Sequence, residues 1–341
     1  MKFEPVTIKD IAKALNLSTS TVSRALRDSY EISAKTKKRV IEYAEEMNYM
    51  PNPIALGLKE RKTRSIGVVV CEIANSFFSQ AINGIESVAY NAGYNVIITQ
   101  SNESYEREVI NVKHLASRSV DGIIISISSE TTDFSHLKEL RDKGMPIVFF
   151  DRIVADIQTH KVTSDNYMGA YNATMHLAQN GYKKIAFLGN AEYLSIIKER
   201  LAGYIKALED SRLPYNPDFI KYCLHGGLIY EETETVLKEL LKGKNKPDAI
   251  IACADKLTTN CLRYFKKNNV SVPNDVGLIG FSNLDLTEWL QPSLSVIRQQ
   301  AFEMGANATE LLVQLISSKR PVKQFENMVL VPNMIIRESS M

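Results

Sequence analysis

Short apolar runs alternate with longer amphipathic segments along most of the chain, from about residue 65 onward. The runs are rich in β-branched residues and have the length of buried strands, whereas the longer segments repeat apolar residues at helical spacing. This alternation predicts parallel sheets covered by helices on both faces. Two sheets of about five or six strands, with a cleft between them, suit the length better than one sheet of about ten. The predicted strands are Ser65–Ile73, Asn95–Gln100, Gly122–Ser126, Pro146–Asp151, Lys184–Gly189, Asp248–Ala252 and Val276–Phe281, and the predicted helices are Phe77–Ala92, Tyr105–Ser117, Tyr167–Asn180, Arg200–Ser211, Glu231–Lys242 and Lys256–Asn268.

The first 50 residues follow the helical spacing alone. Three hydroxyl side chains stand directly before amphipathic segments, where they can accept the free N–H groups of a helix start. The first of them, Thr7, is followed by Asp10 at the spacing of a capping box. Three short helices with a tight turn and one shared apolar stripe predict a helix-turn-helix domain. The predicted order is Thr7 before the first helix, Ser18 before Thr19–Leu26, and Ser33 before Ala34–Met47.

The polar face of the predicted second helix decides the use of this domain. Short hydrogen-bonding side chains and one guanidinium suit a helix that enters the major groove, where they can meet phosphates or base edges. Arg24 can contact guanine through two parallel hydrogen bonds. The alternative is that these hydroxyl groups only cap helices. The outward residues are Thr19, Ser20, Thr21, Ser23 and Arg24.

The linker that follows is apolar where a linker should be polar. Asn52 and Pro53 can start a helix, but Gly57 lies inside it and the helix is too short to persist alone. Its leucines and the lysine and arginine residues after them match the wedge and phosphate contacts of a minor-groove binder. Packing of Leu56 and Leu58 on the rest of the protein is the alternative.

Composition and charge exclude several classes of protein. With 45% hydrophobic and 23% charged residues among 341, the chain is neither disordered nor a coiled-coil rod. Its net charge of +2 divides into +5 for residues 1–64 and −3 for the remainder, as expected when one end meets a polyanion. The four cysteines lack metal-site spacing, and neither a signal peptide nor an apolar run of about 18 residues occurs. We therefore expect a cytoplasmic protein with no metal, no cofactor and no membrane contact.

These residues resemble the LacI/GalR family of bacterial transcriptional regulators. The resemblance begins with VTIKDIAKALNLSTSTVSRAL and ISAKTKKRVIEYAEEMNYMPNPIALGLK. It continues through SIGVVV, DGIIIS, SDNYMGAYNATMHLAQNGYKKIAFLG, RLAGY, PDAIIACAD and VGLIGFSN, and so covers nearly the whole chain. It implies an N-terminal all-α helix-turn-helix headpiece and an α/β body like the periplasmic sugar-binding proteins, with two doubly wound parallel-sheet subdomains.

The resemblance also implies a division of the chain. The headpiece would span residues 1–50, and the hinge helix and linker residues 51–64. The effector-binding and dimerisation body would span residues 65–341. Within the body, the N-subdomain would take about 65–162 and 293–323, and the C-subdomain about 163–292 and 324–341.

The family's DNA-contacting positions carry over residue by residue. Thr19, Ser20 and Arg24 match base-reading positions, and Leu58 matches the minor-groove wedge. Pro53, Gly57 and Leu56 depart from the usual hinge pattern. The full DNA-binding set implied is Thr7, Ser18, Thr19, Ser20, Thr21, Ser23, Arg24, Ser33, Thr36, Asn52, Ala55, Leu58 and Lys59.

For the cleft, the resemblance points to the carboxyl ends of the strands, where an open parallel sheet also places ligands. Aromatic rings with carboxylate, amide and guanidinium groups can hold a polyhydroxylated ligand. A structural ion pair is the alternative role for Arg200. The effector-binding candidates are Asn75, Phe77, Asp151, Arg152, Arg200, Asp255 and Asn283.

The sequence thus predicts a sequence-specific transcriptional regulator, a repressor, whose affinity for pseudo-palindromic operator DNA is set by a small effector, a sugar or sugar derivative. A homodimer is expected, because a two-fold protein matches a two-fold site. The alternatives are a sugar-processing α/β enzyme and a solute-binding receptor. Neither fits well, since no common nucleotide-binding or hydrolase motif and no signal peptide occurs.

Overall fold

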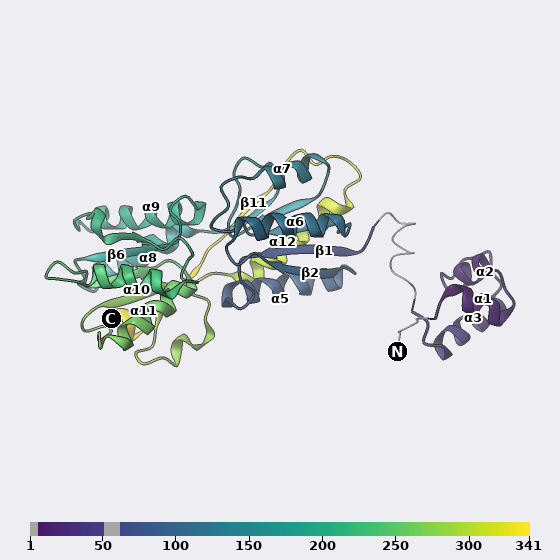
Figure 1. Ribbon diagram of the computed structural model, residues 1–341, viewed down its shortest axis with the longest axis horizontal. Helices are drawn as coiled ribbons and strands as arrows, with labels where there is room; N and C mark the ends of the chain where they lie inside the picture. Colours follow the sequence, from purple (N-terminus) through teal and green to yellow (C-terminus); the bar gives the residue numbers. More distant parts are fainter. Residues whose placement is uncertain (1–5, 51–61) are drawn as a thin grey trace. The chain divides into compact units, whose positions relative to one another are not determined.

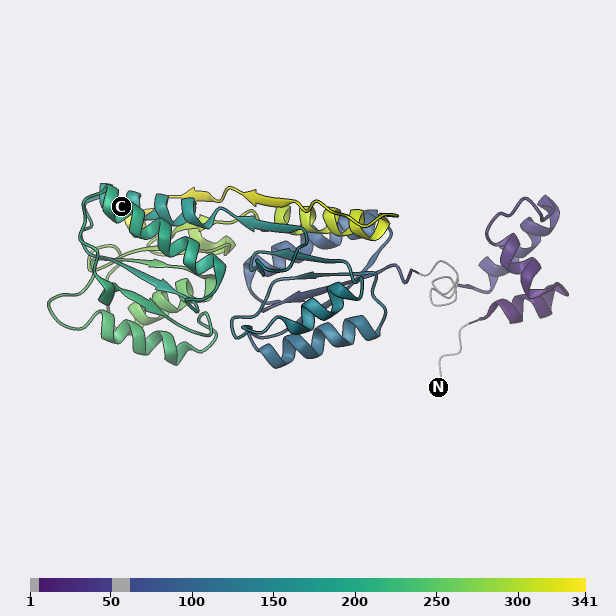
Figure 2. The ribbon, with the colours of Figure 1, turned by 90° about the horizontal axis from the view of Figure 1, so that it is seen from above.

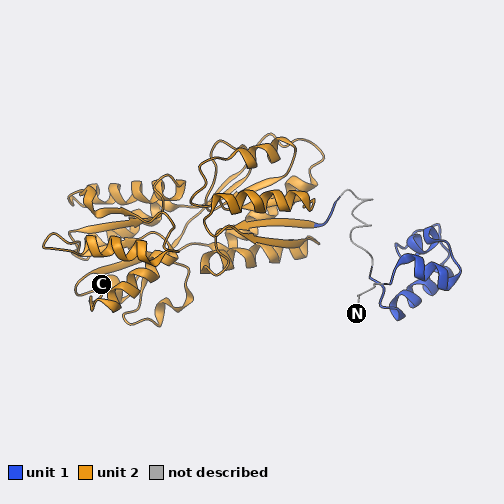
Figure 3. Ribbon diagram, in the orientation of Figure 1, with its two compact units in different colours: residues 1–64 blue, residues 65–341 orange. Residues whose placement is uncertain are grey.

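The structure is a computed structural model of the chain and describes residues 6–50 and 62–341. The chain divides into two compact units, Met1–Arg64 and Ser65–Met341 (Figure 3). We call the helical part of the first unit the headpiece and the second unit the body. Each is described by itself.

The headpiece contains three helices, α1 (Ile8–Leu15), α2 (Thr19–Ala25) and α3 (Ala34–Glu46), as the sequence predicts. Each helix begins at its predicted cap. Thr7 and Asp10 form the capping box, the Ser18 hydroxyl accepts the Thr21 N–H at 3.0 Å, and the Ser33 hydroxyl accepts the Thr36 N–H at 3.3 Å. The apolar faces of the three helices meet in one small core of Ile11, Ala12, Leu15, Val22, Ala25, Val40 and Ala44.

The body contains two six-stranded sheets, which confirms the predicted α/β class (Figure 1). Neighbouring strands are parallel except at β12, which pairs antiparallel with β10. The order of the first sheet is β11 (Asn327–Leu330), β5 (Lys161–Ser164), β4 (Ile147–Phe150), β3 (Gly122–Ile125), β1 (Ser65–Val70) and β2 (Asn95–Gln100). The order of the second is β12 (Asn333–Ile335), β10 (Ser295–Arg298), β9 (Gly277–Phe281), β8 (Ala249–Ala252), β6 (Ile185–Gly189) and β7 (Ile220–Tyr222).

Helices cover both faces of each sheet, so the strands are buried on both sides. The first sheet packs against α5 and α12 on one face and against α6 and α7 on the other. The second packs against α8 and α9 on one face and against α10 and α11 on the other. The helices are α5 (Ser76–Asn91), α6 (Tyr105–Ser117), α7 (Ser135–Asp142), α8 (Asn166–Gln179), α9 (Ser195–Asp210), α10 (Tyr230–Leu240), α11 (Asp255–Lys267) and α12 (Ala301–Ser317).

The chain passes between the two sheets at points that differ from the predicted subdomain boundaries. Strand β10 lies in the second sheet, although residues 293–323 were expected in the N-subdomain, and β11 lies in the first sheet, although residues 324–341 were expected in the C-subdomain. Near the C-terminus, β11 and β12 follow each other and are separated by Val331 and Pro332. Because proline cannot donate to a ladder, the pairing stops there. Figure 2 shows this yellow segment passing from one sheet to the other.

Helices α5 and α12 approach each other so closely that only glycine fits at their contact. A side-chain carbon at Gly84 would overlap the carbonyl of Phe302, and one at Gly305 would overlap the carbonyl of Ala81. The obstructing atoms are backbone, which cannot move aside as a flexible side chain can. The two glycines therefore set the spacing of the helices that cover one face of the first sheet.

Replacement of Gly305 by alanine should therefore destabilise the body. We expect Gly305→Ala to lower the free energy of unfolding by about 3 kcal/mol, the upper range for overpacking. Gln314→Ala, on an exposed position of the same helix, should change it by less than about 0.5 kcal/mol. Urea unfolding followed by circular dichroism measures both, and equal midpoints would contradict the close packing.

Candidate functional site

A polar cavity of about 50 Å³ lies in the body at the carboxyl ends of the strands of both sheets. All seven predicted effector residues line it. Asn75 and Phe77 follow β1, Asp151 and Arg152 follow β4, Asp255 follows β8, Asn283 follows β9, and Arg200 projects from α9. We call this cavity the cleft.

Arg200 carries a buried charge whose hydrogen-bond partners are all neutral. Its side chain donates to Asn166 Oδ1 at 2.9 Å, to the Cys253 carbonyl at 2.7 Å and to Gln299 Oε1 at 3.3 Å. The guanidinium lies 3.9 Å from the centre of the Phe281 ring. Within the described part of the chain, no carboxylate lies within 4.0 Å of it, and burial lowers the pKa of Arg200. The predicted alternative of a structural ion pair therefore does not hold in this state.

Two carboxylates face the cleft. Asp151 has one long ion pair, from its Oδ2 to Arg152 Nε at 3.9 Å, and Asp255 has no cation within 4.0 Å among the described residues. Burial raises the pKa of Asp151 even though Arg152 and Arg200 are close, and Asp151 adopts a left-handed backbone with φ of 57°. Burial also raises the pKa of Asp255, which accepts hydrogen bonds from the Ser282 hydroxyl and the Asn283 N–H. Buried carboxylates and a strained backbone are common where a protein holds a ligand.

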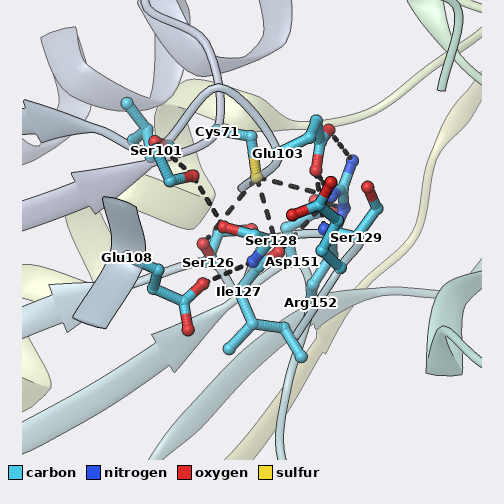
Figure 4. A network of polar contacts seen from close by, with 12 residues as sticks. Cys71, Ser101, Glu103, Glu108, Ser126, Ile127, Ser128, Ser129, Asp151 and Arg152 are labelled. Carbon is cyan, nitrogen blue, oxygen red and sulfur yellow. Dashed lines mark hydrogen bonds and ion pairs between the residues drawn. The ribbon is translucent and has the colours of Figure 1, made fainter. Parts of the chain in front are cut away.

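Arg152 lines the cleft, but most of its guanidinium is engaged elsewhere (Figure 4). Its two terminal nitrogens bind the carboxylate of Glu103 at 2.6 and 2.9 Å, and one also lies 3.4 Å from the Cys71 sulfur. Burial opposes ionisation of Glu103, but Arg152 and the Ser129 N–H outweigh it and hold the pKa of Glu103 below its usual value. Arg152 Nε forms a long ion pair with Asp151 Oδ2 at 3.9 Å but has no hydrogen-bond partner among the described residues, and it is the donor left for a ligand.

The protein itself occupies the two predicted amides to different extents. Asn75 caps α5 by accepting the Phe77 N–H at 3.0 Å. The Asn283 side chain donates to Gln80 Oε1 and to the Gln299 carbonyl, both at 2.8 Å, and accepts the Gln299 N–H at 3.1 Å. Asn283 therefore shapes the wall of the cleft, whereas the amide nitrogen of Asn75 has no hydrogen-bond partner among the described residues.

Sequence reasoning missed part of the lining. Asn190 follows β6 and has a buried Oδ1 without a hydrogen-bond partner among the described residues. Its position at the carboxyl end of a predicted strand was the available signal. The other missed residues are Phe78, Ile196, Cys253, Ala254, Phe281 and Gln299.

Contacts between the two sheets' subdomains close the cleft. The Gln80 amide of α5 donates to the Asn283 carbonyl at 3.1 Å, the Tyr193 hydroxyl donates to the Ser129 carbonyl, and Lys256 pairs with Glu72 at 3.1 Å. These contacts leave a volume far below the roughly 300 Å³ of a small ligand pocket. A ligand larger than a few waters must therefore separate them.

A second cavity of about 370 Å³ is lined by Gln80 and Asn83 of α5 and by residues around the start of α12. It contains none of the seven predicted residues. We place the candidate effector site at the smaller cleft, because the buried charges and the unpartnered polar atoms Arg152 Nε and Asn190 Oδ1 converge there.

The predicted DNA-contacting residues of the headpiece lie on and around α2. Ser18, Thr19, Ser20 and Arg24 are exposed. Arg24 forms an ion pair with Glu31 at 2.6 Å. This ion pair must break before the guanidinium can bind a DNA base. The other predicted residues within the described part are Thr7, Thr21, Ser23, Ser33 and Thr36, of which Ser23 binds Arg27. Asn52, Ala55, Leu58 and Lys59 lie outside the described residues.

A helix-turn-helix unit joined to a two-sheet body with a polar cleft defines a class of transcriptional regulators. Residues 7–52 match the family model of bacterial regulatory proteins, lacI family. Residues 63–330 match that of the periplasmic binding proteins and sugar binding domain of LacI family. The chain belongs to the LacI family and is a transcriptional repressor with a sugar-binding domain, not an enzyme.

Three similar proteins illustrate the match. The HTH-type transcriptional repressor PurR of Vibrio parahaemolyticus is 32% identical, over 98% of each chain. A structure of the transcriptional regulator CelR with cellobiose has 25% identity and a TM-score of 0.73, covering 98% of this chain and 99% of that one. A LacI family regulator from Enterococcus faecium with bound ribose has 27% identity and a TM-score of 0.70, covering 81% and 98%.

Two other kinds of feature are absent from the described residues. In residues 6–50 and 62–341, no cluster of three or more histidine, cysteine or acidic side chains could hold a metal ion. None of the described helices combines the length and apolar character needed to cross a bilayer.

Neutralising Glu103 should leave Arg152 as an uncompensated buried charge. We expect Glu103→Gln to cost about 3 kcal/mol of stability at neutral pH. Because the pKa of Glu103 is lower in the folded protein than its usual 4.5, this difference should shrink as the pH falls below about 4.5. Glu106→Gln, on an exposed position of α6, is the control. Equal unfolding midpoints for the two variants would disprove a stabilising ion pair.

Proposed function

We propose that this repressor binds pseudo-palindromic operator DNA as a homodimer and that a neutral polyhydroxylated effector, a sugar, occupies the cleft and changes its affinity for DNA. The observation that carries the proposal is the composition of the cleft. The buried carboxylate of Asp151, the half-buried carboxylate of Asp255 and the guanidinium of Arg200, which has no carboxylate partner, surround one small space beside phenyl rings.

These groups match the hydrogen-bonding capacity of a sugar. A hydroxyl group donates to a carboxylate and accepts from a guanidinium, and the faces of Phe77 and Phe281 offer apolar contact to ring C–H groups. The ion pair of Arg152 with Glu103 adds no free positive charge. The carboxylates facing the cleft therefore disfavour a phosphorylated or otherwise anionic effector. The bound ribose and cellobiose of the two similar structures support the same class of ligand.

Effector binding would act by moving the subdomains. Because the cleft is closed by direct contacts such as Gln80 with Asn283, a ligand must open it and then bridge both walls. A rigid-body rotation of one subdomain against the other is an ordinary route for such coupling, typically worth about 1–3 kcal/mol between two sites.

A thermal-shift screen tests the class of effector. A ligand that binds only the folded protein raises the melting temperature with its concentration. We expect shifts from neutral pentoses, hexoses or disaccharides and none from their phosphate esters. Shifts from nucleobases or nucleosides alone would overturn the sugar assignment while leaving the DNA-binding function intact.

Asp151→Asn tests effector binding with less effect on folding than a substitution of Arg200 would have. The Arg200 side chain donates hydrogen bonds to Asn166, Gln299 and the Cys253 carbonyl, and its removal would leave all three without this partner. We expect at least about a tenfold loss of effector affinity, because hydrogen bonds to a charged group are worth about 1.5–3 kcal/mol. Without effector, the free energy of unfolding of Asp151→Asn at neutral pH should be higher than that of the wild type. The raised pKa of Asp151 means that the folded protein favours its neutral form, so this advantage should vanish as the pH falls toward 3.8. Calorimetric titration with the sugar found in the screen measures affinity, and unchanged affinity would exclude Asp151 from the site.

Arg24→Ala should relax operator discrimination. A guanidinium bound to guanine through two hydrogen bonds contributes about 1–3 kcal/mol to the choice of base. We expect the ratio of specific to non-specific affinity to fall about tenfold or more, measured by fluorescence anisotropy with duplexes selected from random sequence. Lys38→Ala on α3 is the control, since Lys38 is exposed and pairs with Glu42. A uniform loss on all duplexes would instead make Arg24 a phosphate contact.

A further inference from the structure

The amino-terminal edge of the first sheet carries a group of exposed cations. Parallel strands begin at the same edge, so the turns that precede β3, β4 and β11 lie along it together with the start of β1. Figures 1 and 2 show the yellow turn after α12 at the end of the body where β1 begins. We call the five cations of these turns the basic edge: Arg118, Lys143, Lys319, Arg320 and Lys323.

These cations have no internal task in the structure. All five are exposed, and none has a carboxylate within 4.0 Å among the residues that the structure describes. Two acidic residues, Asp121 and Glu326, lie in the same turns, and Asp142 pairs with its neighbour Arg141 at 2.9 Å. Positive charge therefore exceeds negative charge along this edge, and the five exposed cations can bind an anion.

The chain that leads to the headpiece leaves the body at this edge, because Ser65 is the first residue of β1. The headpiece itself carries little net charge. Residues 1–50 contain nine lysines and arginines against seven acidic residues, a balance of only +2, and the linker of residues 51–64 adds a further +3. Affinity for the DNA backbone rises with the number of phosphates neutralised. A headpiece with so small a net charge therefore leaves phosphates that other cations of the protein can neutralise.

We propose that the basic edge binds the phosphate backbone of the duplex DNA held by the headpiece and adds affinity that does not depend on sequence. The inference rests on the DNA binding proposed above. It assigns a second DNA-contacting surface to the body, in addition to the helix-turn-helix unit. Phosphate contacts position a protein without reading bases, so the contribution should be the same on any duplex.

The body supplies a matched control at its opposite end. Lys242, Lys244 and Lys246 are exposed in the turn between α10 and β8, at the amino-terminal edge of the second sheet. Because the cleft lies at the carboxyl ends of both sheets, the two amino-terminal edges are separated by at least two strand lengths, on the order of 26 Å. The Debye length at physiological salt is about 8 Å, so charges at the control turn are screened from DNA at the basic edge.

The test compares Lys319→Gln/Arg320→Gln/Lys323→Gln with Lys242→Gln/Lys244→Gln/Lys246→Gln, each of which removes three positive charges from an exposed turn of the full-length protein. Fluorescence anisotropy with a labelled mixed-sequence duplex of several helical turns gives the affinity between about 50 and 200 mM salt. The slope of log affinity against log salt should become shallower by roughly 0.9 for each phosphate that the first variant no longer neutralises. The control variant should keep the wild-type slope.

Three results would count against the proposal. Wild-type slopes in both variants would exclude the contact. Equal losses of DNA affinity in both variants would show that only the net charge of the protein matters, not the position of the cations. Failure of the wild-type protein to bind any duplex would overturn the proposed function and the inference with it.

Arg118→Gln/Lys143→Gln, which changes two other turns of the edge, should give a smaller loss of the same kind. Melting temperatures equal to that of the wild type check that the variants fold.

Discussion

The need to compensate charge buried between the two sheets governs much of the body. A buried guanidinium or carboxylate loses its hydration and must recover that free energy from protein or ligand atoms. The Arg152–Glu103 pair recovers it internally, with bidentate geometry and the Ser129 N–H as a further donor. Arg200 recovers only part of it, from neutral partners, and Asp151 keeps a pKa above its usual value. This uncompensated charge is the reason that we propose the cleft as the effector site.

The same groups connect the cleft to the helices that cover the first sheet. Asn283 lies at the end of β9 in the second sheet, yet its side chain binds Gln80 of α5, which covers the first sheet. Helix α5 in turn packs against α12 through Gly84 and Gly305 at backbone distance. A ligand that displaced Asn283 would therefore act on a rigid pair of helices, because closely packed backbones move together.

How far the sequence predicts this molecule depends on whether the responsible signal is local. Thr7, Ser18 and Ser33 cap the helices that they were predicted to cap, since a cap is decided by neighbours three residues away. The carboxyl ends of the predicted strands, read together with the family resemblance, also led to six of the seven lining residues, whereas Arg200 of α9 came from the resemblance alone. Glu103 could not be found in this way, because it meets Arg152 across 49 residues through a left-handed turn after β2. The residues of β10 and β11 were assigned to the wrong subdomains, because a strand of only four residues shows no pattern that reveals the sheet it joins.

The two ends of the first sheet differ in chemical character, and this follows from its parallel topology. Carboxyl ends of parallel strands converge on the cleft, where acidic and guanidinium groups lie together out of solvent, while the amino-terminal edge collects exposed cations and the start of β1. A sheet buried on both faces transmits displacement along its strands with little internal deformation. In the mechanism that we propose, a subdomain rotation that opens the cleft would also shift the basic edge, so that an effector would alter both the linker attachment and the proposed phosphate contacts by one movement. The small net charge of +2 for the whole chain conceals this separation.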